Sequence, residues 1–160
     1  MYFYSLFLCP IVHRLDKHQK LCKYLLFRRS LQPTKGSTMH VLLAEDTTFF
    51  QIMLTDYLEV LGYTVTLKVD GKQAFEEWKN NPANYQLVVT DHDMAVMNGC
   101  QLTKALRAAG CKIPIIMVSF STDPEISTLL TNGALNGFIA KGAGLTPTTL
   151  AALLKKVLPK

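Results

Sequence analysis

The run Gln86-Leu-Val-Val-Thr90, which is followed at once by Asp91-His92-Asp93, is the strongest indication of the fold. Its short apolar run, rich in β-branched residues, predicts a strand. A second run, His40-Val-Leu-Leu-Ala44, has the composition of a strand buried on both faces and ends in Glu45-Asp46. Buried strands that end in acidic residues predict a parallel sheet with a polar site at one edge.

Outward from these runs, strands and helices alternate along the chain. The expected strands are 40–44, 63–69, 86–90, 113–118 and 137–140, and the expected helices are 48–61, 71–80, 100–109, 123–133 and 147–158. Such alternation predicts a parallel sheet covered by helices on both faces. Five repeats in about 120 residues predict an open, doubly wound α/β sheet, because an eight-unit barrel needs about 250 residues.

Cap and core signals support these elements. Asp70, Asp123 and Thr146 are expected to cap helices, the last two because proline follows each of them. Two helices show apolar residues at spacings of three and four, which predict their inward faces. These residues are Phe49, Ile52, Met53, Tyr57, Val60 and Leu61 in the first helix, and Ala74, Phe75 and Trp78 in the second.

The charge of the chain is unevenly distributed. The formal net charge of the 160 residues is +5. Residues 1–38 contain seven Lys or Arg and one acid, whereas residues 39–160 contain ten Lys or Arg and eleven acids. The positive excess therefore lies wholly in residues 1–38. This distribution excludes a basic, nucleic-acid-binding globular domain over residues 39–160.

Residues 1–38 are expected to form an extension before a folded domain at 39–160. Their first twelve residues are apolar, but a membrane-spanning helix needs about 20 residues, and Pro10 interrupts the run. The positive charge follows this run, unlike in a secretory signal peptide. Two interpretations stay open. Either the true start is Met39, after Lys35-Gly36 codons that resemble a ribosome-binding site, or the extension is a disordered or surface-anchoring tail.

The four cysteines form no metal-binding or disulfide pattern. Cys9, Cys22, Cys100 and Cys111 are scattered, and none belongs to a C-x-x-C pair. This usage favours a reducing, cytoplasmic location, with Cys100 and Cys111 as small apolar core residues.

Polar residues follow four of the five expected strands. Glu45 and Asp46 follow the first strand, Asp91 the third, Ser119 the fourth and Lys141 the fifth. Because the carboxyl ends of parallel strands meet at one edge, we expect these side chains to converge. Three carboxylates repel one another unless a divalent cation lies among them, and an all-oxygen ligand set suits Mg²⁺. A metal, an ammonium and a hydroxyl around one carboxylate match the needs of phosphoryl transfer, with Asp91 as the nucleophile.

Five stretches together resemble the receiver domain of two-component response regulators, over about residues 39–158. They are Val41-Leu-Leu-Ala-Glu-Asp46, Leu87-Val-Val-Thr-Asp91, Met97-Asn-Gly99, Ile113-Pro-Ile-Ile-Met-Val-Ser119 and Phe138-Ile-Ala-Lys141. The resemblance implies a flavodoxin-like (βα)5 fold with strand order 2-1-3-4-5. It also implies a phosphoacceptor signalling switch, similar to stand-alone chemotaxis regulators, rather than an enzyme that acts on a separate substrate.

The resemblance assigns the phosphoryl and metal chemistry to particular residues. Asp91 would accept a phosphoryl group from a histidine kinase or a histidine phosphotransfer protein. Glu45, Asp46, Asp91 and the backbone carbonyl of Asp93 would hold Mg²⁺. Lys141 would contact the phosphoryl oxygens.

The switch residues implied by the resemblance are Ser119 and Phe138. Ser119 would move to hydrogen-bond the phosphoryl group, and Phe138 would turn inward behind it. This motion would reshape the face formed by the fourth helix, the fifth strand and the fifth helix. A downstream protein would bind there, and a homodimer through the same face is a further expectation.

The sequence departs from the family pattern near the site. Ala95 and Gly142 stand where the family has prolines, and Phe120 replaces a small residue. A cis bond before glycine costs about 2.5–4 kcal/mol, so we predict a trans Lys141–Gly142 bond and a rearranged loop. The bulk of Phe120 is expected to narrow access to Asp91 or to lean on the output face. Asp93 adds a carboxylate whose effect has no predicted sign.

Three alternatives remain open at this point. A receiver fold that is no longer phosphorylated would act as a pure interaction module. Asp91-His92-Asp93 also resembles the D-x-D motif of haloacid dehalogenase-type phosphatases, although that motif follows the first strand there. The chain also resembles receivers of hybrid histidine kinases, so a fragment or relative of such a kinase is the third alternative.

Overall fold

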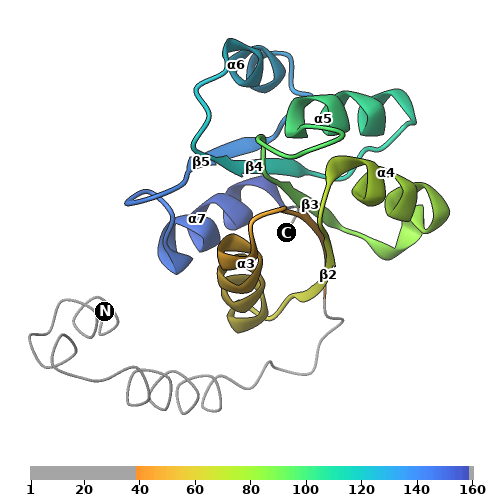
Figure 1. The fold of residues 1–160 in the computed structure, drawn as a ribbon. Coiled ribbons are helices and arrows are strands. Elements are labelled where there is room, and N and C mark those ends of the chain that lie inside the picture. Colours follow the sequence, from red (N-terminus) through yellow and green to blue (C-terminus); the bar gives the residue numbers. More distant parts are fainter. Residues whose placement is uncertain (1–38, 159–160) are drawn as a thin grey trace, which may run out of the picture. The chain divides into compact units, whose positions relative to one another are not determined.

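A computed structural model describes residues 39–158 of the chain (Figure 1). The expectations for residues 1–38 lie outside the described residues. The strands are β1 His40–Ala44, β2 Thr64–Lys68, β3 Leu87–Thr90, β4 Ile115–Ser119 and β5 Gly137–Ala140. The helices are α3 Thr48–Val60, α4 Gly71–Asn80, α5 Gly99–Ala108, α6 Pro124–Thr131 and α7 Pro147–Val157, with a short 3₁₀ helix at Pro82–Asn84.

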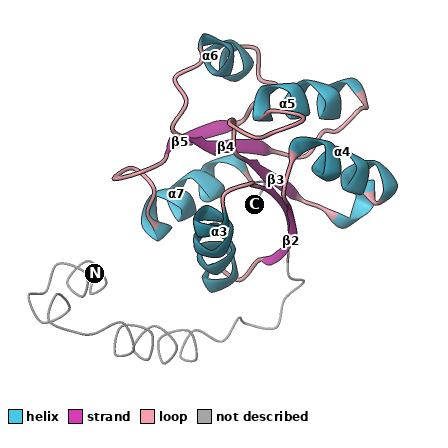
Figure 2. Cartoon of the chain, in the orientation of Figure 1, coloured by secondary structure: helices cyan, strands magenta, loops and turns pink. Residues whose placement is uncertain are grey.

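The five strands form one parallel sheet in the order β2-β1-β3-β4-β5. Helices α3 and α7 cover one face, and α4, α5 and α6 cover the other (Figure 2). The doubly wound fold and its predicted strand order are therefore confirmed. From β1 the chain first adds β2 on one side and then crosses to add β3 on the other. The topological switch point therefore lies between β1 and β3, and ligands of α/β sheets bind at such points.

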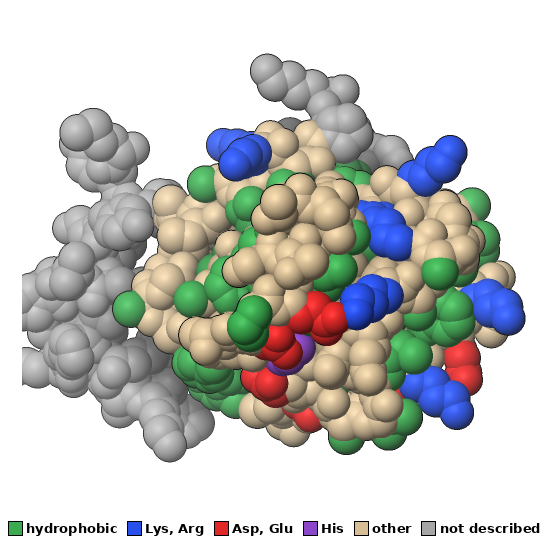
Figure 3. Space-filling model, turned by 90° about the horizontal axis from the view of Figure 1, so that it is seen from above, with side chains coloured by type: hydrophobic (Ala, Val, Ile, Leu, Met, Phe, Trp, Pro, Cys, Tyr) green, Lys and Arg blue, Asp and Glu red, His purple; other side chains and the backbone are tan. Residues whose placement is uncertain are grey.

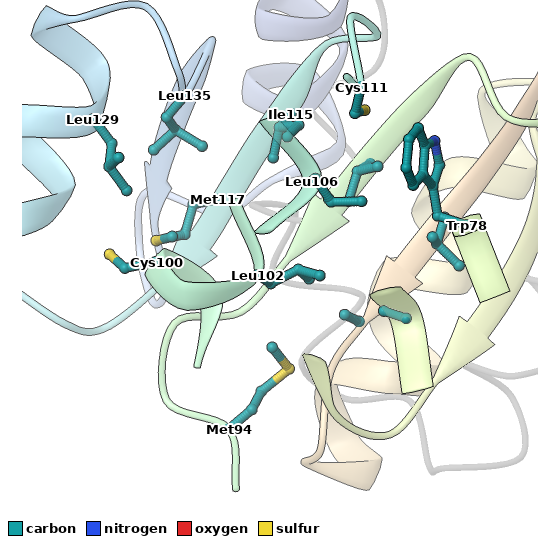
Figure 4. Close-up of a cluster of buried hydrophobic side chains, with 14 of the residues drawn as sticks. Trp78, Met94, Cys100, Leu102, Leu106, Cys111, Ile115, Met117, Leu129 and Leu135 are labelled. Carbon is teal, nitrogen blue, oxygen red and sulfur yellow. The ribbon is translucent and has the colours of Figure 1, made fainter. Parts of the chain in front are cut away.

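Apolar side chains form a core on each face of the sheet. On one face, Leu54 and Leu58 of α3 and Leu150 and Leu154 of α7 pack against the strands. Figure 4 shows the other cluster, where side chains of α4, α5 and α6 meet β4.

Cys100 and Cys111 lie buried in this second cluster with free thiols, as predicted. Burial is the largest cause that raises the pKa of Cys100 to about 12, and it raises the pKa of Cys111 as well. Both thiols therefore remain protonated at neutral pH and act as small apolar groups.

The predicted inward face of the first helix is partly wrong. Phe49 and Ile52 of α3 are 66% and 61% exposed, whereas Leu54 and Leu58 are fully buried. Because α3 is rich in apolar residues, more than one stripe has the spacing of a core face. The sheet buries the stripe centred on Leu54 and Leu58, and the helix therefore shows hydrophobic side chains to solvent. In α4, Ala74, Phe75 and Trp78 face the core as predicted.

Local signals explain most element boundaries. Asp70, Asp123 and Thr146 each accept a backbone N–H at the start of α4, α6 and α7, as predicted. Strand β4 begins two residues later than expected, after Pro114, which has no N–H to donate to a strand ladder. Helix α5 begins one residue earlier than expected, because Asn98 forms a reciprocal capping box with Gln101.

Candidate functional site

Strand register brings the predicted site residues together. Ala44 of β1 pairs with Thr90 of β3, so the residues that follow these two strands lie at the same level. The Asp91 N–H donates to the Ala44 carbonyl at 2.9 Å, and the Lys141 N–H donates to the Ser119 carbonyl at 2.9 Å. The ladder therefore continues one residue beyond the strands and fixes the backbone of the site.

Lys141 joins two buried carboxylates. Its Nζ lies 2.6 Å from Asp91 Oδ2 and 2.9 Å from Glu45 Oε2. Asp91 is 3% exposed, Glu45 is fully buried, and Lys141 is 7% exposed. In such a dry environment each charge needs a partner, and the ammonium supplies one for both carboxylates.

The environment of Glu45 disfavours its ionised form even with Lys141 beside it. The pKa of Glu45 is raised to about 7, chiefly by burial and to a smaller extent by the nearby Asp91 charge. The hydrogen bond and charge of Lys141 act in the opposite direction, as does the Thr47 N–H that donates to Glu45 Oε1 at 3.2 Å. The ionised form of Glu45 is therefore costly while Lys141 is its only cation.

Asp46 completes a set of three carboxylates. Glu45, Asp46 and Asp91 each offer an oxygen, and the three oxygens lie within 4.8 Å of one another. Asp46 is exposed, so a hydrated cation can reach the group from solvent. Hard oxygen donors, a surplus of negative charge and access to water fit Mg²⁺. The role of the Asp93 backbone carbonyl as a fourth ligand stays a prediction.

The other two predicted side chains, Ser119 and Phe138, are not part of this carboxylate group, and His92 adds a contact to Asp91. The His92 N–H donates to Asp91 Oδ1 at 2.6 Å, so both oxygens of Asp91 are held. The buried Ser119 hydroxyl donates to Asp93 Oδ2 at 3.3 Å. Phe138 of β5 is half-buried and packs against the cluster shared by α4, α5 and α6.

Two aromatic rings, of Phe50 and Phe120, lie near Lys141, and only Phe50 was not expected from the sequence. The Lys141 Nζ lies 4.1 Å from the centre of the Phe50 ring and 6.0 Å from that of Phe120. The two rings meet edge to face, with their centres 5.7 Å apart. Phe120 is 63% exposed, and the expectation that it narrows access to Asp91 or leans on the output face stays a prediction. No spacing signal marks Phe50, because its contact with Lys141 joins α3 to the residue that follows β5.

The loop after Lys141 also differs from the family pattern. Residues 39–158 contain no cis peptide bond, so the Lys141–Gly142 bond is trans, as predicted. Gly142 has a φ of +91°, a conformation that glycine adopts more readily than other residues.

The surface above the site combines charge and hydrophobic groups. Figure 3 shows acidic side chains gathered around one histidine, with lysine or arginine and hydrophobic side chains beside them. The exposed hydrophobic groups on α3 and after β4 are Phe49, Ile52 and Phe120. Acidic, basic and hydrophobic side chains therefore lie beside one another on this face.

Comparison with known proteins identifies the family. A family model described as the response regulator receiver domain matches residues 41–155. The chemotaxis protein CheY1 of Helicobacter pylori is 33% identical over 124 residues, which cover 75% of this chain and 97% of that protein. The peroxide stress-activated histidine kinase Mak1 of Schizosaccharomyces pombe is 32% identical over 111 residues, which cover 66% of this chain and 7% of the kinase.

A solved structure agrees in fold. The receiver domain of the sensor histidine kinase PA1611 from Pseudomonas aeruginosa, with a magnesium ion coordinated in its active-site cleft, matches with a TM-score of 0.66 and 25% identity. The match covers 76% of this chain and 98% of that chain. The chain therefore belongs to the response regulator receiver domain family, the regulatory domains of two-component and phosphorelay systems. Within residues 39–158, no helix is long and apolar enough to cross a lipid bilayer.

Proposed function

We propose that this protein is a phosphoacceptor switch in which Asp91 takes a phosphoryl group from a partner phosphohistidine. One observation carries the proposal. Asp91 is a buried carboxylate at the end of β3, with one oxygen paired to Lys141 and the other held by the His92 N–H, beside two further acids. The match to the magnesium-bound PA1611 receiver domain supports the same assignment.

The transfer itself needs no other nucleophile. An oxygen of Asp91 forms a bond to phosphorus, the phosphorus–nitrogen bond of the phosphohistidine breaks, and the imidazole leaves with the bonding electron pair. Asp91 then carries an acyl phosphate. The protein assists only its own phosphorylation and dephosphorylation in this scheme.

The metal ligands proposed for Mg²⁺ are Glu45, Asp46, Asp91 and the backbone carbonyl of Asp93. When bound, Mg²⁺ supplies positive charge beside the phosphoryl oxygens. Lys141 then pairs with the phosphoryl oxygens, because its ammonium already lies 2.6 Å from Asp91 Oδ2. The burial of Lys141 makes this interaction strong, since few water molecules compete for its N–H groups.

The output is a change of the surface formed by α6, β5 and α7. Ser119 ends β4, and Phe138 lies on β5, which is one of the two edge strands of the sheet. Movement of the Ser119 hydroxyl toward the phosphoryl group allows Phe138 to turn inward, which favours one of two states of this surface. A downstream protein, or a second copy of the chain, binds this surface in one of the two states. The proposed setting is the cytoplasm, where a histidine kinase or histidine phosphotransfer protein supplies the phosphoryl group.

To test this proposal, the full chain is incubated with acetyl phosphate and Mg²⁺, and its intact mass is measured. We expect the protein to gain one phosphoryl mass and the Asp91→Asn variant to gain none, because the amide is a poor nucleophile. Asp56→Asn on α3 is the matched control and should be phosphorylated normally.

Two other results would change the assignment. Equal phosphorylation of the Asp91→Asn variant would show that Asp91 is not the acceptor. If neither protein gained mass although Mg²⁺ bound, the interaction-module alternative would take the place of the switch. Partner binding unaffected by Asp91→Asn would agree with that alternative.

A further inference from the structure

A ring of polar contacts joins the loop after β3 to the start of α6. The Ser119 hydroxyl donates to Asp93 Oδ2 at 3.3 Å and accepts the Ser121 N–H at 3.1 Å. The Ser121 hydroxyl accepts the Asp123 N–H at 3.2 Å. His92 Nε2 lies 3.4 Å from Asp123 Oδ2, which closes the ring because His92 and Asp93 are neighbours in the chain.

The hydroxyl of Ser119 is the critical group in this ring. A hydroxyl has one hydrogen to donate, and the Ser119 hydroxyl is fully buried, so its hydrogen needs a nearby acceptor. In the structure this acceptor is the Asp93 carboxylate. A phosphoryl group on Asp91 requires the same hydrogen, so Asp93 and the phosphoryl group compete for it.

We propose that the Asp93 side chain is the resting partner of Ser119 and holds the loop between β4 and α6 in its resting state. This proposal rests on the proposed function, because the competing ligand is the phosphoryl group on Asp91. Asp93 is a positioning residue here, since it acts through Ser119. It gives a sign to the effect of the additional carboxylate: Asp93 favours the resting state.

The ring also reaches the output surface. Asp123 caps α6 by accepting the Glu125 N–H at 2.8 Å, so the ring ends on the first turn of that helix. His92 adds a second connection. Its backbone N–H donates to Asp91 Oδ1, and its ring Nε2 lies close to Asp123 Oδ2. Release of Ser119 from Asp93 therefore loosens the loop that leads into α6.

The side chain of Asp93 is free to take part in such an exchange. It is 63% exposed, so water can replace Ser119 as its partner when the hydroxyl leaves. A contact of this kind shifts an equilibrium by a modest factor rather than locking it.

Two substitutions separate the hydrogen bond from the charge. Asp93→Asn removes the negative charge but retains an oxygen that accepts the Ser119 hydroxyl. Asp93→Ala removes both. Comparison of Asn with Ala therefore reports the hydrogen bond alone, whereas comparison of Asp with Asn reports the effect of charge on an incoming phosphoryl group.

The first measurement is the affinity of the full chain for beryllofluoride, a phosphoryl analogue, in the presence of Mg²⁺. We expect Asp93→Ala to bind roughly fivefold more tightly than Asp93→Asn, because one neutral hydrogen bond to the resting state is lost. In a Ser119→Ala background the same pair should bind equally. Glu76→Ala, which removes an exposed acid of α4, is the control for nonspecific loss of charge and should bind like the wild type.

Two results would overturn the proposal. If Asp93→Asn and Asp93→Ala bound beryllofluoride equally well with Ser119 present, Asp93 would affect binding through its charge alone. A difference between them that persisted without the Ser119 hydroxyl would show that Asp93 acts on another group.

A second measurement does not depend on phosphorylation. The Ser121 and Asp123 amides donate within the ring, so their hydrogen exchange in the resting protein should be roughly fivefold faster in Asp93→Ala than in Asp93→Asn. If the wild type bound no beryllofluoride, the proposed function would fail. The hydrogen-exchange rates would still test whether Asp93 holds Ser119 in the resting protein. Equal exchange in the two variants would refute the contact.

Discussion

Val96 shows backbone strain at the scale of a single residue. It lies in the loop between Asp91 and α5, and its φ is +65°, the one positive φ of a non-glycine residue among residues 39–158. A left-handed conformation costs an L-residue roughly 1–2 kcal/mol, and a β-branched side chain is especially unsuited to it. The side chain is 78% exposed, so it gains little packing in return.

We therefore expect Val96→Gly to raise the free energy of unfolding by roughly 0.5–1 kcal/mol, the relief of strain less the entropy that glycine adds to the unfolded chain. Urea unfolding of the full chain measures this. The matched control is Ala95→Gly, next to it in the same exposed loop but without a positive φ, which should lower stability. If both variants lost stability, the strain at Val96 would be negligible.

Gly99 shows the opposite case, in which no side chain is tolerated. A Cβ at this position would lie 2.1 Å from the backbone oxygen of Asp91. The start of α5 therefore packs directly against the backbone of Asp91. The sequence showed the Met97-Asn-Gly99 motif, but only the structure gives the physical reason for its glycine.

At the level of secondary-structure elements, helix α3 contributes a side chain to the site, in addition to Glu45 and Asp46, which precede it in the chain. Phe50 of α3 packs against the core of its face and places its ring beneath the Lys141 ammonium, at 4.1 Å. Phe49 contacts the Phe50 ring edge to face at 5.2 Å but points to solvent. One ring therefore helps to hold the ammonium, and its neighbour does not.

We expect Phe50→Leu to slow phosphorylation by acetyl phosphate by up to about fivefold, the effect of losing a cation–π contact of about 1 kcal/mol. Phe49→Leu is the matched control, since it removes an adjacent ring of the same helix. Rates from intact mass, with stability measured in parallel, compare the two. Equal rates in both variants would show that Lys141 is held by its carboxylates alone.

Some features of the site could be predicted from the sequence patterns of strands and helices, and others could not. The ends of parallel strands meet at one edge, so the grouping of Glu45, Asp91 and Lys141 could be predicted from strand patterns alone. The buried stripe of α3 could not, because that helix has apolar residues on more than one side. The contact between Asp93 and Ser119 spans 26 residues and depends on two loop conformations. No periodic signal encodes contacts of that kind.

At the scale of the whole molecule, the fold concentrates negative charge at one point. Residues 39–160 have almost balanced charge, with ten basic and eleven acidic residues. Three of the acids nevertheless gather at the carboxyl edge of the sheet, with Lys141 as the paired cation. Burial, and then the charge of Asp91, raise the pKa of Glu45, so keeping these carboxylates ionised in the folded state costs free energy. A bound cation should therefore stabilise the entire domain.

We expect Mg²⁺ at ten times its dissociation constant to stabilise the protein by about 1.4 kcal/mol, because a ligand that binds only the folded state shifts the unfolding equilibrium by mass action. For a domain of this size, that corresponds to a rise of roughly 4 °C in Tm. Thermal melts with Mg²⁺, and again after chelation with EDTA, measure the effect at ionic strength held constant with NaCl. Asp46→Asn should lose most of the rise, since it removes the exposed ligand without disturbing the buried ion pairs. Glu76→Gln, an exposed acid of α4, should keep the rise. An identical response from all three proteins would mean that Mg²⁺ acts through general screening and not at the three carboxylates.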